Sequence, residues 1–159
     1  MSVAELVAAH LPYLRRFARA VTGSQKSGDA YVASTLEAML VDPSIFPEDL
    51  PPRMALYRTF LKLVNSIKWN NQKTHEPGHA GLEAATRNLD ALDPAARQAF
   101  LLIAVEEFSP AEAAIVLDVD ESQLQSLIDE AGQEIARQIA SDVVIIEDEP
   151  LIALGLERL

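Results

Sequence analysis

Apolar residues recur at helical spacing along most of the chain, and the first such stripe covers residues 2–22. Pro12 lies inside this stripe, so the helix either kinks there or begins again just before the proline. Residues 23–28 contain two glycines and two serines and predict a loop. Asp29 is then a suitable N-cap for a second helix over residues 30–41.

A third helix is predicted over residues 52–71, after a connection punctuated by prolines. Its apolar positions fall on one face, and three helices of this length can enclose a small core. Residues 72–87 keep no sustained pattern and predict an interdomain linker. The pattern therefore predicts a first helical module over residues 1–71.

A second module is predicted over residues 88–140, where the helix signals are strongest. Ser109 and Glu112 have the spacing of a capping box, with a proline at the first helical position between them. The short helix that they begin ends in a tight turn at residues 118–120, and Asp120 begins a longer helix. A short helix, a three-residue turn and a longer helix form the layout of a helix-turn-helix, which typically reads DNA.

The charge of this second module does not suit DNA. No Lys or Arg lies between Gln98 and Ala136, whereas nine acidic residues do. Duplex DNA binds where Lys or Arg neutralises phosphates, so this acidic helix would be repelled from a groove. The chain carries a formal net charge of −11, of which residues 1–87 contribute +2 and residues 88–159 contribute −13. The asymmetry predicts two modules with different surfaces, and a basic or amphipathic partner for the second.

Composition restricts the remaining classes of function. With 159 residues and 49% hydrophobic content, the chain can bury a core in one or two small domains. No apolar run reaches the ~18 residues that span a bilayer, and the first residues do not form a signal peptide. We therefore expect a soluble cytoplasmic protein. No cysteine, phosphate-binding loop, catalytic triad signature or zinc motif is present, so we expect no enzymatic activity.

The pattern changes near the end of the chain. Residues 142–146 form a β-branched run typical of a buried strand, followed by the acidic residues Glu147 and Asp148 and a helix start. A single strand cannot form a sheet. Residues 141–159 are therefore predicted to be the truncated opening of an α/β domain, and the chain to be the N-terminal portion of a longer protein.

Three stretches resemble known families. The segment HLPYLRRFARAVTGSQKSGDAYVASTLEAML is similar to the region 2 opening of extracytoplasmic-function sigma factors. The segment LDALDPAARQAFLLIAVEEFSPAEAAIVLDVDESQLQSLIDEAGQEI is similar to their region 4, and VVIIEDEPLIALGLE resembles the start of a receiver domain. This order of modules resembles the PhyR family of response regulators. The resemblance implies an all-α fold of two modules like sigma regions 2 and 4, plus a truncated strand–helix remnant of a receiver.

The resemblance also implies a function. A PhyR-type chain is an anti-anti-sigma factor, a sigma-factor mimic that sequesters a small helical anti-sigma factor similar to NepR in the general stress response. In the full protein, a histidine kinase would control it by phosphorylating a receiver aspartate, which must lie beyond Leu159. Glu147 and Asp148 would be the acidic pair that binds Mg²⁺ in a complete receiver. In this chain that site is incomplete, and solvated acids are the alternative.

Departures from active sigma factors support mimicry. Basic residues of the sigma recognition helix fall where this chain has Gln125, Leu127, Glu130 and Gly132, so no DNA binding is expected. We expect the mimic to dock amphipathic helices in apolar grooves. The candidate contacts are Leu36, Leu40, Leu124, Leu127 and Glu130. Leu127 is either an exposed anchor or a residue at the edge of the core.

Two other functions are considered. A genuine extracytoplasmic-function sigma factor or DNA-binding regulator would read DNA with Arg58, Lys62 and Lys68, and Trp69 could stack on a base. An ordinary solvated helix carries such residues too, and the structural interpretation is favoured. An acidic RNA- or adaptor-binding regulator of another receiver-linked family is the third alternative.

Two further sets of residues are interpreted as structural. His75 and His79 are four residues apart, but a proline and a glycine between them prevent a shared helix face, so neither they nor His10 are expected to bind metal. The acidic pairs at residues 106–107 and 129–130 are expected on solvated helix surfaces, because nothing supplies a pocket or a nucleophile.

Overall fold

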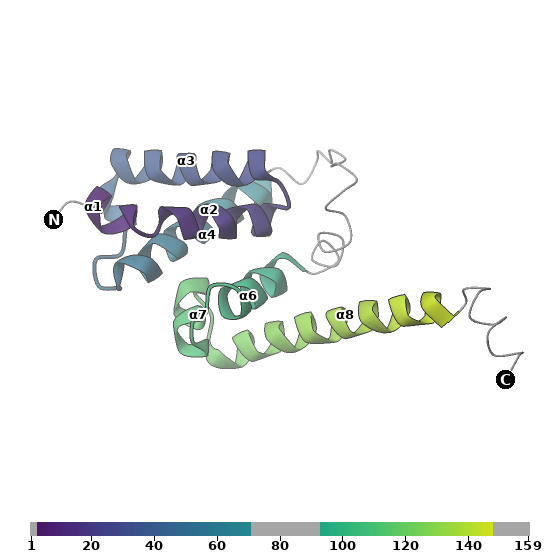
Figure 1. The fold of residues 1–159 in the computed structure, drawn as a ribbon. Helices are drawn as coiled ribbons and strands as arrows, with labels where there is room; N and C mark the ends of the chain where they lie inside the picture. The colour runs from purple at the N-terminus through teal and green to yellow at the C-terminus, as the bar shows by residue number, and fades with distance from the viewer. Residues whose placement is uncertain (1–2, 71–92, 148–159) are drawn as a thin grey trace, which may run out of the picture.

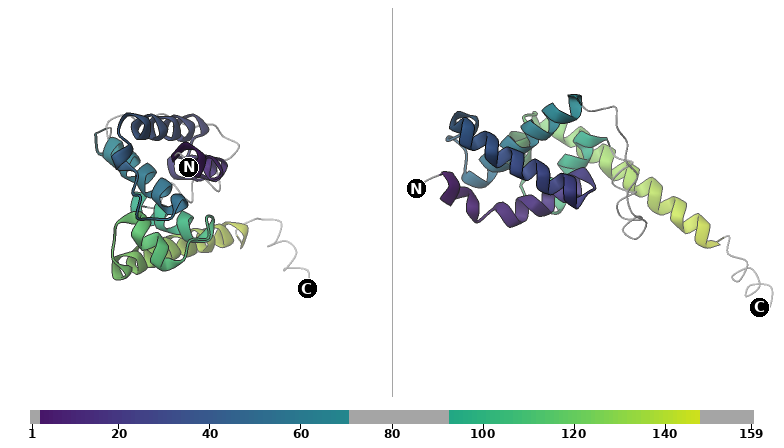
Figure 2. Two further views of the ribbon diagram at one scale, coloured as in Figure 1. Left: turned by 90° about the vertical axis from the view of Figure 1, so that its left-hand side faces the viewer. Right: turned by 90° about the horizontal axis from the view of Figure 1, so that it is seen from above.

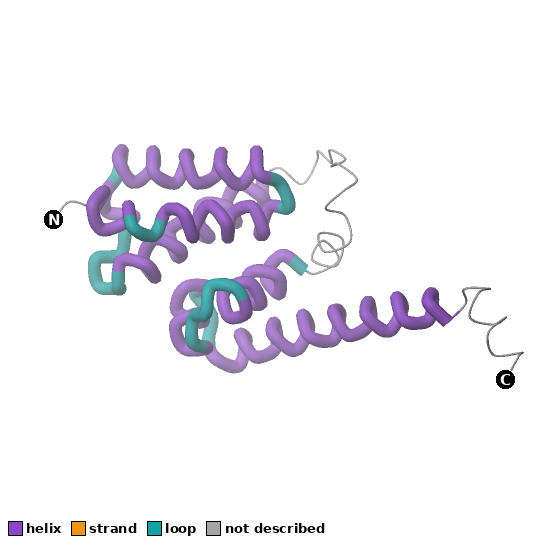
Figure 3. Tube along the Cα trace, viewed as in Figure 1, coloured by secondary structure: helices purple, strands orange, loops and turns teal. Residues whose placement is uncertain are grey.

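The computed structural model describes residues 3–70 and 93–147, and within these ranges every regular element is a helix (Figures 1 and 3). The predicted all-α class is confirmed. The first module contains α1 (Val3–Ala8), α2 (Leu11–Thr22), α3 (Gln25–Val41), the 3-10 turn η1 (Pro43–Ile45) and α4 (Pro52–Asn70). The second contains α6 (Pro94–Ala104), α7 (Pro110–Leu117) and α8 (Glu121–Glu147).

The first helical stripe is divided in two, as Pro12 predicts. α1 ends in a turn in which the His10 N–H donates to the carbonyl of Val7 over 2.9 Å. α2 then begins at Leu11, so the proline occupies the first turn, where its missing N–H costs no helical hydrogen bond. Gly23 ends α2 with a φ of 71°, a left-handed conformation that glycine adopts without steric cost.

The predicted loop at residues 23–28 and the predicted Asp29 cap are wrong. α3 already begins at Gln25, because the Ser24 hydroxyl accepts a hydrogen bond from the Ser27 N–H at 3.3 Å. Gly28 is buried inside α3 and lies against the backbone of α2. The missing side chain allows the two helices to approach closely, which a sequence pattern alone does not distinguish from a flexible loop.

One hydrophobic core runs through both modules. α4 is its centre, with Leu56, Tyr57 and Phe60 fully buried. The Tyr57 ring lies 5.1 Å from that of Phe17 on α2 and 5.2 Å from that of Phe108, which precedes α7. Most buried residues of α6, α7 and α8 join the same cluster, and Ala96 and Ala131 form a small second one. The two modules are therefore packed as one body, with α1–α4 above α6–α8 in Figure 1.

The short helix, the turn and the longer helix that the sequence predicts are present as α7, residues 118–120 and α8. At the start of α7, the Glu112 N–H donates to the Ser109 hydroxyl at 3.3 Å and the Ser109 N–H donates to the Glu112 carboxylate at 2.8 Å. Asp118 ends α7 with a φ of 60°. Asp120 and Gln123 then cap α8 by a second reciprocal pair, at 3.0 and 2.8 Å. Local capping chemistry thus sets each boundary of this unit.

The predicted strand at residues 142–146 is wrong in the described part of the chain, because α8 continues through Glu147 and projects beyond the other helices (Figure 2). A helix satisfies its backbone N–H and C=O groups within one segment, whereas a strand needs a neighbour. The remainder of the receiver start predicted over residues 141–159, which is residues 148–159 with most of the acidic turn, lies outside the described residues. So does the predicted linker at 72–87.

The two described helical glycines provide a matched test of this packing. A Cβ at Gly28 would lie 2.7 Å from the backbone nitrogen of Arg19, whereas a Cβ at Gly132 meets nothing within 4 Å. We predict that Gly28→Ala lowers the free energy of unfolding by about 1–3 kcal/mol, because α2 and α3 must separate. Gly132→Ala should raise it by about 0.5–1 kcal/mol through helix propensity alone. Denaturant titration measures the free energy of unfolding of both variants. If both substitutions changed it equally and with the same sign, the close packing of α2 against α3 at Gly28 would be contradicted.

Candidate partner-binding surface

The junction between the modules is built around Glu106, in the connection between α6 and α7. Its N–H donates to the Leu101 carbonyl at 3.0 Å, and the next residue, Glu107, turns the chain with a φ of 57°. This turn directs Glu106 inward, where it is only 2% exposed. The expectation that residues 106 and 107 are both solvated acids is therefore wrong for Glu106 and right for Glu107, which is exposed.

Three side chains of the first module meet the Glu106 carboxylate. Arg16 on α2 donates to Oε1 at 2.9 Å, and the Tyr57 hydroxyl on α4 donates to Oε2 at 2.7 Å. Arg53 on α4 approaches Oε2 at 3.6 Å and donates to the Glu106 carbonyl. Burial, followed by the hydrogen bond to Glu106, raises the pKa of Tyr57 well above its ordinary value, so the phenol stays a donor. We call these four residues the Glu106 cluster.

Two more polar contacts tie α4 to the second module. Arg58 donates to the Asp118 carboxylate at 2.6 Å and to the carbonyl of Ile115, at the end of α7. Asn65 and the buried Gln98 of α6 exchange amide hydrogen bonds of 2.8 and 3.4 Å. Arg58, which a DNA-binding protein would direct at phosphate, is therefore engaged within the molecule.

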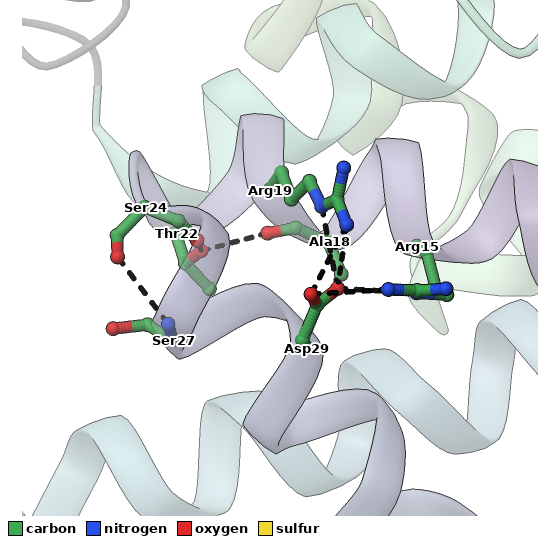
Figure 4. A network of polar contacts seen from close by, with 7 residues as sticks. All are labelled: Arg15, Ala18, Arg19, Thr22, Ser24, Ser27 and Asp29. Atoms are coloured by element: carbon green, nitrogen blue, oxygen red, sulfur yellow. Dashed lines mark hydrogen bonds and ion pairs between the residues drawn. The ribbon is translucent and has the colours of Figure 1, made fainter.

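A second ionic group stabilises the pairing of α2 with α3. Asp29 on α3 points toward Arg15 and Arg19 on α2 (Figure 4), and the closest of these ion pairs is 3.0 Å long. The hydrogen bonds from Arg15 and Arg19 lower the pKa of Asp29 from 3.8 to about 2. Asp29 is thus a link between two helices rather than the cap that the sequence predicts.

The outer face of α8 is exposed and acidic near its start. Gln125, Asp129, Glu130 and Gly132 are all exposed. The Gln125 amide donates to the Asp129 carboxylate at 2.9 Å, one helical turn further on. Sigma factors carry basic residues at four positions of this helix where the present chain has none, and three of these four positions therefore lie on an accessible surface. The fourth, Leu127, is partly buried.

The predicted partner contacts fall into two groups. Leu36 and Leu40 lie one turn apart on α3; Leu36 is half-buried, and Leu40 is 79% exposed. Leu124 is only 1% exposed and belongs to the core, so it is not accessible in this arrangement. Leu127 packs beside Ala96 and Ala131 at the edge of the core, which is the second of its two predicted positions.

The end of α3 carries the most exposed apolar side chains among the described residues. Leu40 and Val41 are 79% and 87% exposed, and Ile45 of η1 is exposed as well. We call these three residues the α3 patch. The acidic residues Glu37 and Asp42 are exposed beside it in the chain. An apolar patch with an acidic rim suits a partner helix that is apolar on one face and basic at its edges.

The described residues form no cation site of the predicted kind. Glu147 is the last residue of α8, and Asp148 lies outside the described residues. Residues 3–70 and 93–147 contain no group of three or more His, Asp or Glu side chains placed to hold a metal. His10 lies in the turn between α1 and α2, and His75 and His79 lie outside these ranges. No described helix is long and apolar enough to cross a membrane.

The Glu106 cluster could not be predicted from the sequence, because its members are far apart in the chain. Arg16, Arg53 and Glu106 each look like ordinary charged positions on amphipathic helices. In the sequence VEEFS the two acids directly precede buried Phe108, but Val105 before them is exposed, so no local signal separates Glu106 from Glu107.

The described helices have the arrangement of a sigma-like protein. At the level of the fold, the chain resembles the sigma factor RpoE of Bartonella quintana, solved in complex with the anti-sigma factor NepR. The TM-score is 0.70 at 18% identity, over 86% of this chain and 95% of that chain. Family models match in both modules, the Sigma2 domain of PhyR over residues 7–61 and the PhyR sigma-like domain over residues 89–138. The chain belongs to the PhyR family.

Individual relatives agree with this assignment. The phyllosphere-induced regulator PhyR of Methylorubrum extorquens is 48% identical over 162 residues, which cover 100% of this chain and 58% of the relative. The NMR structure of the PhyRSL–NepR complex from Sphingomonas sp. Fr1 matches with a TM-score of 0.72 and 44% identity, over 87% of this chain and 89% of that chain. The chain thus spans somewhat more than half the length of its curated relative and nearly all of the solved sigma-like domain.

The ion pairs of Asp29 predict a specific dependence of stability on pH. Because the folded pKa is lowered, the ionised carboxylate stabilises the fold at pH values above its ordinary pKa of 3.8, and this contribution is lost as the pH falls toward about 2. We predict that wild type is more stable than Asp29→Asn at neutral pH and that this difference narrows through that window. Denaturant titrations at several pH values measure it. A difference that stays constant down to the lowest pH would contradict the assigned ion pairs.

Proposed function

We propose that this chain is an anti-anti-sigma factor, which imitates a sigma factor and sequesters a small NepR-like anti-sigma factor. The observation that carries the proposal is the retention of both sigma-like modules as one packed body in a member of the PhyR family. The Sphingomonas domain that matches nearly all of this chain was solved in complex with NepR. A protein with the surface of a sigma factor competes for what binds the sigma factor.

Charge supports mimicry over promoter binding. The exposed face of α8 that would enter a DNA groove carries Asp129 and Glu130. No Lys or Arg occurs in the sequence between residues 98 and 136. Arg58 is held by Asp118 and the end of α7. Binding to DNA would therefore gain little counterion release from this module and would lose a contact between the modules. The role that we propose is binding to a protein, without promoter recognition and without catalysis.

The α3 patch is the described surface most suited to a protein partner. Apolar side chains as exposed as Leu40 and Val41 gain about 1.5–3 kcal/mol each when a partner removes them from water. Leu36 lies one turn before Leu40 on the same helix and extends the patch toward the core. Two of the contacts predicted from the sequence, Leu36 and Leu40, belong to this surface. Leu124 is buried elsewhere, and we propose no direct contact for it.

The larger regulatory cycle is proposed on family resemblance alone. In the longer protein, a receiver domain phosphorylated by a histidine kinase would control access to the sigma-like domain in the general stress response. Mg²⁺ would bind the completed receiver, with Glu147 and Asp148 as its predicted acidic pair. The protein would act in the cytoplasm, where sigma factors act.

The main test is a calorimetric titration of this chain with the NepR of the Sphingomonas relative. We expect one partner per chain and a dissociation constant below about 1 µM. A promoter fragment at low salt is the control, because a genuine sigma factor or DNA-binding regulator would bind it under those conditions. Specific promoter binding, or no heat with NepR at micromolar concentrations, would refute the proposal.

The α3 patch is tested by an exposed leucine and a matched exposed isoleucine. Leu40→Ser should weaken NepR binding by about tenfold or more, because an apolar side chain that the partner buries is replaced by a polar one. Ile139→Ser, on α8, makes a similar change at a side chain that is 57% exposed and should leave the affinity unchanged. Both variants should keep the wild-type melting temperature. Equal losses at both sites would exclude the α3 patch as the specific contact.

A further inference from the structure

The Glu106 cluster differs from the other contacts between the modules because it is directional. The Tyr57 and Phe108 rings and the aliphatic core can slide against each other at small cost, since apolar burial depends on area rather than direction. The Glu106 carboxylate instead accepts from Arg16 on α2 at one oxygen and from Tyr57 on α4 at the other. Two oxygens held by two helices fix how the α6–α7 connection is oriented against the first module.

Burial makes this orientation strict. A carboxylate that is 2% exposed cannot exchange its protein donors for water unless the modules separate. The guanidinium of Arg53 adds to the constraint, because it lies 4.1 Å above the Phe108 ring and also donates to the Glu106 carbonyl. The donors and cations around the Glu106 carboxylate are Arg16 of α2 and Tyr57 and Arg53 of α4, so the carboxylate is satisfied only when the two modules are together.

The outer edge of the cluster reaches the surface where the two modules meet. Arg16 is half exposed; its guanidinium lies 5.6 Å from the Tyr13 ring and donates to the Val105 carbonyl at 3.5 Å. Tyr13 of the first module and Val105 of the second are both exposed apolar side chains. A partner that contacts both modules therefore meets a surface whose shape depends on the cluster.

We propose that Glu106 is a positioning residue for partner binding, which holds the two modules in the relative arrangement that the anti-sigma partner recognises. This inference rests on the proposed function and concerns its regulation. If a partner binds only one arrangement of the modules, its apparent dissociation constant rises as the fraction of molecules in that arrangement falls. We call this the competent fraction. Glu106 keeps that fraction high without contacting the partner, because its own carboxylate is buried.

The arrangement can be measured without the partner. The sequence contains no cysteine, so Ser34→Cys on α3 and Gln133→Cys on α8 place one exposed label on each module. We expect spin-label distances in the wild-type background to form one narrow distribution. Glu106→Gln keeps the side-chain size but removes the charge that Arg16 and Arg53 neutralise, and it should broaden the distribution. Glu107→Gln, the exposed neighbour with the same charge change, should leave it narrow.

The same variants are then titrated with NepR from the Sphingomonas relative. Glu106→Gln should bind about tenfold more weakly or worse, as expected if the competent fraction falls to about a tenth, and Glu107→Gln should bind like wild type. Arg16→Gln provides a second variant at a half-exposed position, where loss of the side chain leaves the core packing intact. Arg16→Gln should also broaden the distance distribution and weaken NepR binding, both by less than Glu106→Gln does. Its helical circular dichroism should be unchanged.

The two readouts decide the proposal together. Broadened distances with weaker binding for Glu106→Gln and Arg16→Gln, and neither for Glu107→Gln, support it. Unchanged distances would overturn it whatever the affinity, and broadened distances with wild-type affinity would overturn it too. If wild type itself did not bind NepR, the proposed function would fail, while the distances would still decide whether Glu106 fixes the arrangement.

Discussion

A carboxylate that leaves water must be met by hydrogen-bond donors, and Glu106 finds its donors on the other half of the chain. Arg16, Arg53 and Tyr57 surround it, and the aromatic core continues from Phe17 through Tyr57 to Phe108 beneath it. The shared core holds the two modules as one body, and this polar contact fixes how the α6–α7 connection is oriented, next to the surface near Tyr13 and Val105. The second module supplies the acceptor of this contact, and the first module supplies the donors.

The sigma-like shape and the acidic surface are consistent once the contacts of each cation are known. Arg15 and Arg19 neutralise Asp29, Arg16 and Arg53 neutralise Glu106, and Arg58 neutralises Asp118. The guanidinium groups of the first module that could meet phosphate are instead used to hold helices together. The exposed face near the start of α8 carries Asp129 and Glu130, and the exposed end of α3 carries Leu40 and Val41. Both surfaces favour a protein partner over a nucleic acid.

Local chemistry was predictable from the sequence, and contacts across the chain were not. The break before Pro12 and the capping box of Ser109 and Glu112 depend on neighbouring residues, and both were predicted correctly. The start of α3 was misplaced because Ser24 and Asp29 are equally good caps locally; in the structure Ser24 is the cap, and Asp29 pairs with Arg15 and Arg19 on another helix. Glu106 was assigned to the solvent for the same reason. The run at residues 142–146 has strand composition, but a strand forms only with a neighbour, and α8 needs none.

The central claim is that this chain replaces a sigma factor on an anti-sigma factor. Its most direct test is a competition experiment with the complex of NepR and the sigma factor RpoE from Bartonella quintana. RpoE carries a fluorescent label, and its anisotropy is followed while the chain is added. Mimicry predicts that RpoE is released in proportion to the added chain, until one chain is bound per NepR. If NepR held both proteins at once, or if RpoE stayed bound at saturating concentrations of the chain, the account would be contradicted.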